Sequence, residues 1–310
     1  MTAPAGTWDT DHVTAVVGRC ADEVEARYVL ADVARKAADV LRRGLASGAY
    51  DPKPADGAGL DAPALAAALT TDLQEVTHDL HLRVVHHPDG VPPAEDPQAH
   101  AAHWLDQARR TAGGVRRVER LDGNVAHLVL GPVLTVAAHS HDHVTAAMAL
   151  VADADALLLD VRDCLGGDPD TVQLLLSHVV GEEPVRLADL DSRAEGVRQR
   201  WTQPVAPRRF GPDRPLVVLT SARTFSGGEE VAFDVRDLGR GRLVGERTRG
   251  GANPRVGVTL DDELELTLPV ARALSPRTGA SWEGTGVEPD VECPAEEALD
   301  RALDLLRRDR

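Results

Sequence analysis

The segment Leu216-Val-Val-Leu-Thr-Ser-Ala-Arg-Thr-Phe-Ser226-Gly-Gly-Glu-Glu230 passes from an apolar run through a polar turn to two glycines and two acids. A short apolar run bounded by turn residues is typical of a buried strand. A serine directly before a helix-forming stretch is typical of a helix N-terminus. The segment therefore predicts a strand over residues 215–220 and a helix over residues 227–238, joined by a tight turn that holds Ser226.

The chain on both sides of this segment alternates between strand-like and helix-like patterns. Such alternation favours an α/β layer with a mostly parallel central sheet. Two strand-like runs about Asp122-Gly-Asn124 predict a hairpin, and residues 181–214 give the least clear pattern. The other predicted elements after residue 81 are strand 82–85, helix 98–112, hairpin strands 118–121 and 125–130, helix 144–152, strand 156–161, helix 171–180, strands 242–244 and 263–270, and helix 295–306.

The start of the chain is organised differently. Apolar positions recur at helical spacing over residues 11–48, which predicts two amphipathic helices, and again over residues 61–76, which predicts a third. Three short helices in succession indicate a small helical subdomain. We therefore predict an N-terminal helical subdomain, residues 1–80, followed by an α/β domain, residues 81–310.

Composition excludes several classes of function. The formal net charge of −16 opposes binding to nucleic-acid phosphates and to anionic membrane surfaces. A hydrophobic content of 43% indicates a globular chain. The sequence does not open on a basic region followed by an apolar run, and no apolar run is long enough to span a membrane. We therefore predict a soluble, cytoplasmic protein with reduced cysteines and with no nucleic-acid or membrane partner; oligomer formation is left open.

Ser226 has two interpretations. Unpaired N–H groups and the helix dipole at a helix N-terminus stabilise a developing oxyanion, which suits a nucleophile. The alternative is a serine that only caps the helix, which is a frequent role. The Gly-x-Ser-x-Gly sequence that presents nucleophiles in other hydrolases is absent.

Three further segments carry residues suited to catalysis, and each also has an ordinary structural interpretation. The apolar run that ends at Asp160 leads into Gly166-Gly167, where the backbone can approach a ligand closely. Glu283 lies in a glycine-rich loop beside Trp282. His81 lies at a helix-to-strand junction, where a histidine acts as a base or is structural.

Taken together and in this order, these segments resemble the S41 serine peptidases, and most closely the branch of the tricorn core protease and the interphotoreceptor retinoid-binding protein repeats. The resemblance implies a layered ClpP/crotonase-like α/β peptidase domain after the helical part, and a serine-type peptidase that acts on peptides or unfolded proteins without a cofactor or metal. It covers nearly the whole chain and rests on the segments Asp79-Leu-His-Leu82, Asp160-Val-Arg-Asp-Cys-Leu-Gly-Gly167, Thr224-Phe-Ser-Gly-Gly-Glu-Glu230, Val244-Gly-Glu-Arg-Thr-Arg-Gly-Gly-Ala-Asn-Pro254 and Trp282-Glu-Gly-Thr-Gly-Val-Glu-Pro-Asp290.

The resemblance assigns a role to each member of a triad. It implies that Ser226 is the nucleophile, His81 the general base and Glu283 the acid that orients the histidine. The tail-specific proteases of the family use a lysine as base, in the segment that corresponds to Thr248–Gly251. No lysine follows Lys53 in this chain, so a Ser-Lys dyad is excluded.

The resemblance also implies an oxyanion hole. The backbone N–H of Gly227, together with that of Gly166 or Gly167, would stabilise the oxyanion. The chain departs from the family pattern at two positions. Cys164 replaces the usual asparagine of the glycine turn, and Leu80 stands where tricorn-type sites place a hydroxyl residue before the histidine.

Two rival interpretations remain at this point. The run His139-Ser-His-Asp-His143 offers zinc-type ligands, but it directly precedes a predicted helix with Asp142 in an N-cap position, which favours a solvated helix start. A rival of another class is a non-catalytic module of the same fold that binds a hydrophobic ligand or a peptide. Retention of Ser226, His81 and Glu283 favours the enzyme.

Overall fold

The structure is a computed structural model that describes residues 9–52, 60–91, 97–205 and 208–308. The chain folds into two compact units. Unit 1 comprises Met1–Glu95, Asp191–Val197 and Asn253–Arg272, and unit 2 comprises Asp96–Leu190, Arg198–Ala252 and Ala273–Arg310. Unit 1 therefore extends past residue 80, the predicted domain boundary, and takes in two later segments.

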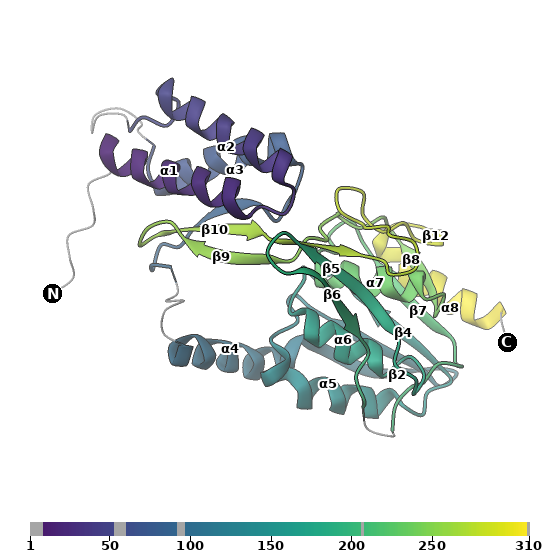
Figure 1. Cartoon of the computed structure of the whole chain (residues 1–310). Helices are drawn as coiled ribbons and strands as arrows, with labels where there is room; N and C mark the ends of the chain where they lie inside the picture. Colours follow the sequence, from purple (N-terminus) through teal and green to yellow (C-terminus); the bar gives the residue numbers. More distant parts are fainter. Residues whose placement is uncertain (1–8, 53–59, 92–96, 206–207, 309–310) are drawn as a thin grey trace. The chain divides into compact units, whose positions relative to one another are not determined.

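Unit 1 combines helices with a small antiparallel sheet of strand order β1-β10-β9. The three helices lie side by side (Figure 1), as predicted for the N-terminal part. Asp9 and Asp61 cap two of them, accepting hydrogen bonds from the backbone N–H groups of His12 (2.8 Å) and Ala64 (2.9 Å). The described elements are α1 (Thr10–Arg27), α2 (Ala31–Ala46), α3 (Ala62–Thr77), β1 (Arg83–His86), β9 (Arg255–Thr259) and β10 (Leu264–Pro269).

The end of α3 determines where the predicted base lies. Leu69 and Leu73 of α3 are buried in one core cluster with Leu264 and Leu266 of β10. The helix stops at His78, whose φ of 55° is in the left-handed region and ends helical hydrogen bonding. The chain then turns through residues 79–82 into β1.

Unit 2 is built on a six-stranded sheet of order β12-β8-β7-β4-β3-β2. Only the β2–β3 pair is antiparallel; the other pairs in this sheet are parallel. The predicted hairpin and the mostly parallel sheet are thus confirmed. The described elements are α4 (Pro97–Thr111), the 3-10 helix η1 (Ala112–Gly114), β2 (Val115–Leu121), β3 (Val125–Leu130), α5 (Ala137–Val151), β4 (Ala156–Asp160), α6 (Pro169–Ser177), β7 (Leu216–Thr220), α7 (Gly227–Asp237), β8 (Arg242–Gly245), β12 (Val291–Glu292), the 3-10 helix η2 (Ala295–Glu297) and α8 (Ala298–Arg308).

The central strand β4 is buried on both faces. Leu157 and Leu159 belong to the core cluster that includes α5, α6 and α7, whereas Ala156 and Leu158 belong to the cluster that includes α8. Parallel strands covered on both faces show continuous apolar runs rather than alternation. This explains why β4 and β7 are the clearest strands in the sequence.

Five of the described strands lie outside every strand predicted from the sequence, and one of them is the two-residue β12. The strands β5 (Arg186–Ser192) and β6 (Gly196–Trp201) form a separate sheet with β11 (Ala271–Leu274), in the order β11-β5-β6. Both β5 and β6 fall in the stretch 181–214, which has no clear pattern. Almost every residue of β6 is exposed, and an exposed strand needs no apolar alternation. The strand β9 is also largely exposed.

The helix α5 starts earlier than predicted, at Ala137 rather than Val144. The backbone N–H of Ala137 donates to the Asp168 carboxylate (3.2 Å), which also caps α6 by accepting from Thr171 N–H (3.0 Å). A side chain distant in sequence therefore accepts from the N–H group at the helix start, which no local side chain caps. Asp142 lies inside the helix and not at its N-cap, so that prediction is wrong.

The Asp160-Val-Arg162 motif at the end of β4 is part of a buried ionic network. The Arg162 guanidinium donates two hydrogen bonds to Asp160 (2.6 and 2.9 Å) and one to the carbonyl oxygen of Ala295 (2.6 Å). Burial by itself raises the pKa of Asp160, but the hydrogen bonds from Arg162 and His127 outweigh it and hold this pKa well below its usual value. The motif therefore ties β4 to the start of the C-terminal helical segment.

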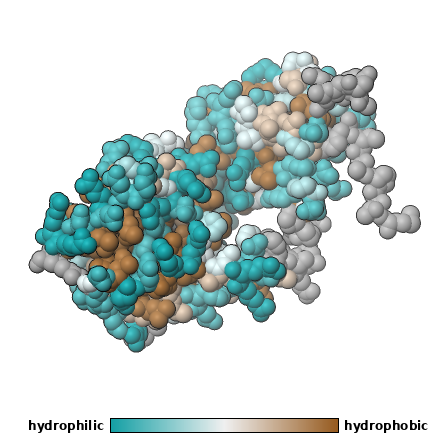
Figure 2. Space-filling view, turned by 180° about the vertical axis from the view of Figure 1, so that it is seen from behind, coloured by the Kyte–Doolittle hydropathy of each residue, from teal (hydrophilic) through white to brown (hydrophobic). Residues whose placement is uncertain are grey.

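The surface is mainly hydrophilic on the face drawn in Figure 2, with separate apolar patches. Within the described ranges, none of the helices combines the length and the apolar character that crossing a membrane would require.

Leu158→Ala tests the role of β4. The side chain is fully buried, so the lost contacts and the remaining cavity should lower the free energy of unfolding by about 2–5 kcal/mol. Urea denaturation followed by circular dichroism measures this change. Leu150→Ala on the exposed face of α5, where the side chain is 66% exposed, is the control and should change stability by about 0.5 kcal/mol or less. Equal losses in both variants would contradict the assignment of β4 to the core.

Candidate active site

Ser226 lies in a strained turn between β7 and α7. It occupies the N-cap position of α7 with φ 52° and ψ −121°, whereas a residue that only caps a helix is normally extended. Positive φ is uncommon for a residue with a Cβ and costs about 1–3 kcal/mol. The turn is held by the Thr224 hydroxyl, which donates to the Val161 carbonyl (2.9 Å), and by the Phe225 N–H, which donates to the Cys164 carbonyl (3.0 Å).

The predicted oxyanion glycines lie against Ser226. Gly166 and Gly167 have φ of 126° and 141°, values that favour glycine. A Cβ on Gly166 would lie 2.8 Å from Ser226 Cβ, and one on Gly167 would lie 2.2 Å from the Leu134 carbonyl oxygen, so neither position accommodates a side chain. Among the described residues, no acceptor pairs with the backbone N–H groups of Gly166, Gly167 or Gly227.

Cys164 is a packing residue beneath this turn. Its Sγ lies 3.6 Å from the Gly166 carbonyl oxygen, and a Cβ on Gly228 would lie 2.8 Å from the Cys164 carbonyl oxygen. Burial raises the pKa of the Cys164 thiol to about 11, so the thiol is neutral and unreactive at neutral pH. Backbone hydrogen bonds, such as that from Leu165 N–H to the Pro132 carbonyl (2.7 Å), hold the turn without the family's asparagine.

The carboxylate of Glu229 connects the serine turn to a second loop. The side chain is fully buried and accepts hydrogen bonds from the backbone N–H of Ser226 (2.9 Å), Gly250 (2.6 Å) and Gly251 (2.7 Å) and from the Thr248 hydroxyl (2.6 Å). Burial raises the pKa of Glu229, and these four hydrogen bonds oppose the rise. Glu229 therefore occupies the N–H of Ser226, whereas the N–H of Gly227 has no acceptor among the described residues.

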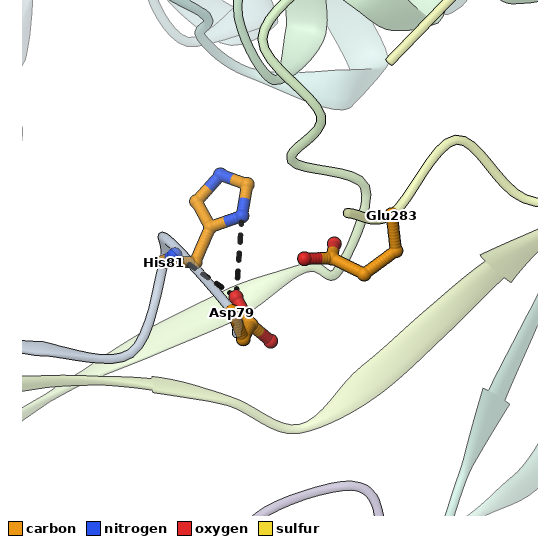
Figure 3. Close-up of side chains that lie close together, drawn as sticks. All are labelled: Asp79, His81 and Glu283. Carbon is orange, nitrogen blue, oxygen red and sulfur yellow. Dashed lines mark hydrogen bonds and ion pairs between the residues drawn. The ribbon is translucent and has the colours of Figure 1, made fainter. Parts of the chain in front are cut away.

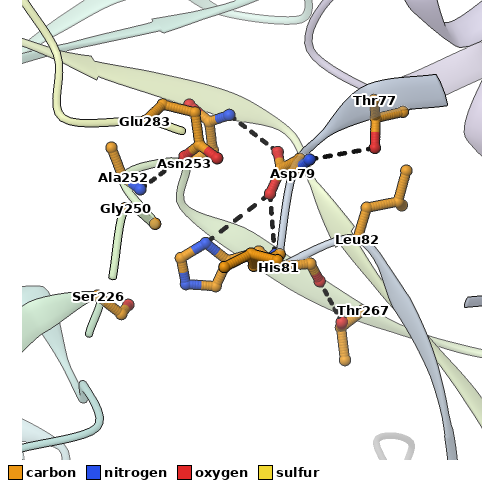
Figure 4. Close-up of polar contacts among 12 residues, drawn as sticks. Thr77, Asp79, His81, Leu82, Ser226, Gly250, Ala252, Asn253, Thr267 and Glu283 are labelled. Carbon is orange, nitrogen blue, oxygen red and sulfur yellow. Dashed lines mark hydrogen bonds and ion pairs between the residues drawn. The ribbon is translucent and has the colours of Figure 1, made fainter. Parts of the chain in front are cut away.

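Glu283 is attached to the same loop. The backbone N–H of Ala252 donates to Glu283 Oε2 at 2.6 Å (Figure 4). The neighbouring Trp282 is buried, and its Nε1 donates to the Gly251 carbonyl at 3.0 Å. Residues 248–252 thus hold the loop of the predicted orienting acid as well as the first turn of α7.

His81 belongs to unit 1, on the turn between α3 and β1, and its side chain is buried. Its backbone N–H donates to Asp79 Oδ1 at 2.9 Å, and its Nδ1 lies 4.0 Å from the same oxygen (Figure 3). The predicted base therefore has an acid of its own unit beside it. Ser226 and Glu283 belong to unit 2.

The histidine run does not form a metal centre within the described ranges. The structure places His139, His141 and His143 on α5. In the described part of the chain, no group of three close His, Cys, Asp or Glu ligand atoms includes any of them. The zinc interpretation is therefore not supported.

Sequence analysis did not identify Glu229, Thr248 or Asp79 as parts of the site. The Ser226-x-x-Glu229 spacing is that of a capping box, which is a usable signal for Glu229. The Asp-x-His spacing is a weaker signal for Asp79. Nothing local identifies Thr248, because its partner is 19 residues away.

Comparisons with known proteins identify the family of this chain. A model described as Peptidase family S41 matches residues 133–293, and one described as the N-terminal domain of Peptidase S41 in eukaryotic IRBP matches residues 10–110. The chloroplastic C-terminal processing peptidase of Tetradesmus obliquus is 32% identical over 141 residues, which are 45% of this chain and 29% of that protein. This chain thus matches less than a third of the length of that relative.

Two solved structures share the fold. The tricorn protease superposes with a TM-score of 0.63 at 14% identity, covering 97% of this chain and 37% of that one. The photosystem II D1 C-terminal processing protease superposes with a TM-score of 0.54 at 16% identity, covering 94% and 97%. Because the S41 model spans half of the sequence and includes the serine turn, the glycine turn and the Glu283 loop, this chain belongs to peptidase family S41.

Proposed function

We propose that this chain is a serine peptidase that cleaves peptide bonds through an acyl-enzyme on Ser226. The observation that carries the proposal is the strained backbone of Ser226 directly beside glycine N–H groups that have no acceptor among the described residues. Strain that the surrounding structure maintains at one residue is typical of active sites. Free N–H groups beside a nucleophile stabilise the oxyanion of acyl transfer. A helix cap requires neither feature.

In the proposed reaction, Ser226 Oγ attacks the carbonyl carbon of the peptide while His81 takes the hydroxyl proton. This step requires His81, from unit 1, to reach Ser226. The protonated His81 then gives the proton to the leaving amine, the C–N bond breaks and an ester remains on the serine. Water activated by His81 hydrolyses this ester. Glu283 orients the imidazole and stabilises its charged form.

A histidine base is supported by composition as well as by the resemblance. No lysine follows Lys53, so the second half of the chain offers none for a dyad with Ser226. Peptides and unfolded proteins are the proposed substrates, since S41 is a family of peptidases. The alternative is a non-catalytic module that binds a hydrophobic ligand or a peptide, and such a module would not react covalently at Ser226.

Ser226→Ala tests the nucleophile. We expect wild-type protein to react with a fluorophosphonate at Ser226 and to cleave a peptide library, and the variant to do neither, with a rate loss on the order of 10⁴–10⁶. Mass spectrometry locates the label, and thermal unfolding checks the fold. Ser47→Ala, on the exposed end of α2, is the control and should keep full labelling. Unchanged hydrolysis by Ser226→Ala would overturn the proposal, and an unlabelled, inactive wild type would favour the binding module.

Glu229→Gln tests the carboxylate that holds the serine turn. A glutamine amide has one acceptor oxygen in place of two and cannot pair with all four donors, so we expect the free energy of unfolding to fall by about 1–3 kcal/mol. We expect kcat to fall about tenfold or more, because the serine is misplaced. Glu230→Gln is the matched control: Glu230 is the next residue of α7, is also buried and pairs with Arg200 (3.0 Å). It should lose stability but keep its labelling rate. Equal losses of kcat in both variants would show that the effect comes from a less stable α7 and not from the position of Ser226.

Glu283→Gln tests the orienting acid. The amide oxygen can still accept from Ala252 N–H, but the negative charge that stabilises protonated His81 is lost. We expect kcat to fall by roughly 10² with little change in melting temperature. Glu288→Gln, in the same loop and paired with Arg247 at the surface, should leave kcat unchanged. A normal kcat for Glu283→Gln would remove Glu283 from the triad.

A further inference from the structure

The turn that carries His81 is fixed from several elements of unit 1. The side-chain amide of Gln74 on α3 donates to the carbonyl oxygens of Leu80 (3.4 Å) and Leu82 (3.2 Å). The hydroxyl of Thr267 on β10 donates to the His81 carbonyl oxygen (Figure 4). The carbonyl groups of Leu80, His81 and Leu82 are therefore all fixed by hydrogen bonds. These bonds do not orient the imidazole ring, which depends on the contacts of the side chain itself.

Asp79 is the charged group at the centre of this arrangement. Its carboxylate is 1% exposed and accepts hydrogen bonds from the Tyr28 hydroxyl (3.2 Å), the Asn253 amide (2.9 Å) and the His81 backbone N–H (2.9 Å). Burial raises the pKa of Asp79, and these hydrogen bonds oppose that rise. Each of the three is donated to the carboxylate, which is the pattern that an ionised acid requires.

The same carboxylate faces the imidazole. Asp79 Oδ1 lies 4.0 Å from His81 Nδ1 (Figure 3), within the range at which an opposite charge favours a protonated ring. Among the described residues of unit 1 that hydrogen-bond to this turn, Asp79 and Tyr28 are the titratable ones; Gln74, Thr267 and Asn253 are neutral.

We propose that Asp79 is the positioning residue of His81: it fixes the turn of the base and supplies negative charge beside Nδ1. The inference rests on the proposed function, in which His81 is the base. Through Tyr28, which ends α1, it makes the N-terminal helices part of the catalytic arrangement. Glu283 remains the orienting acid of the proposed triad.

Asp79→Asn in the full-length chain tests this role. Asparagine keeps the size and the acceptor for His81 N–H but removes the charge. We expect the pKa of His81, measured by NMR titration of the ring Cε1–H signal, to fall by about 1, and kcat to fall about tenfold with little change in KM, because a weaker base accepts the serine proton less readily. Asp261→Asn is the matched control, since Asp261 pairs with His12 (3.0 Å) in the same unit; it should leave His81 unchanged.

A second measurement needs no substitution. In the wild type, the Asp79 carboxyl carbon signal should show an inflection at the pKa of His81, because the two groups interact. Absence of this inflection overturns the inference. So does a His81 pKa that is the same in Asp79→Asn as in Asp261→Asn. A shifted His81 pKa in a chain that neither reacts with fluorophosphonate nor cleaves peptides overturns the proposed function and leaves the pairing of Asp79 with His81 standing.

Discussion

A carboxylate removed from water destabilises a fold by several kcal/mol unless donors surround it. Glu229 meets this requirement with donors from two loops: the N–H of its own helix start at Ser226, and the Thr248, Gly250 and Gly251 donors. The Ser226 turn and the loop of residues 248–251 therefore fix each other's position, since neither can move without leaving the buried Glu229 carboxylate short of donors. The Glu283 loop is bonded to Ala252, the residue after Gly251. This one buried acid therefore links the Ser226 turn to the segment that holds the Glu283 loop.

The second constraint is steric. The turn at Gly166-Gly167 passes so close to Ser226 and to the Leu134 backbone that a Cβ at either glycine would overlap them. In the described part of the chain, the N–H groups of Gly166, Gly167 and Gly227 beside this close approach have no acceptor. The central strands hold these segments in register, because β4 and β7 are buried on both faces and end at neighbouring positions. A rigid sheet thus maintains the backbone strain at the serine.

The two units contribute different chemistry to the proposed reaction. Unit 2 contains the nucleophile, the glycine turn and Glu283, and unit 1 contains His81 with Asp79. The second half of the chain has no lysine, and in the proposed reaction the base comes from unit 1. Its helices hold that base indirectly, through the Tyr28 hydroxyl on Asp79 and the Gln74 amide on the His81 turn.

The sequence by itself determined the features that local patterns encode. These are the apolar strands β4 and β7, the strand–turn–helix about Ser226, the β2–β3 hairpin and the N-terminal helices, because burial periodicity and turn chemistry act over a few residues. Tertiary structure alone decided the rest. The early start of α5 depends on Asp168, and the exposed strand β6 carries no apolar alternation. The partners of Glu229 and Asp79 come from segments up to 174 residues away, and no local pattern records contacts that only folding brings together.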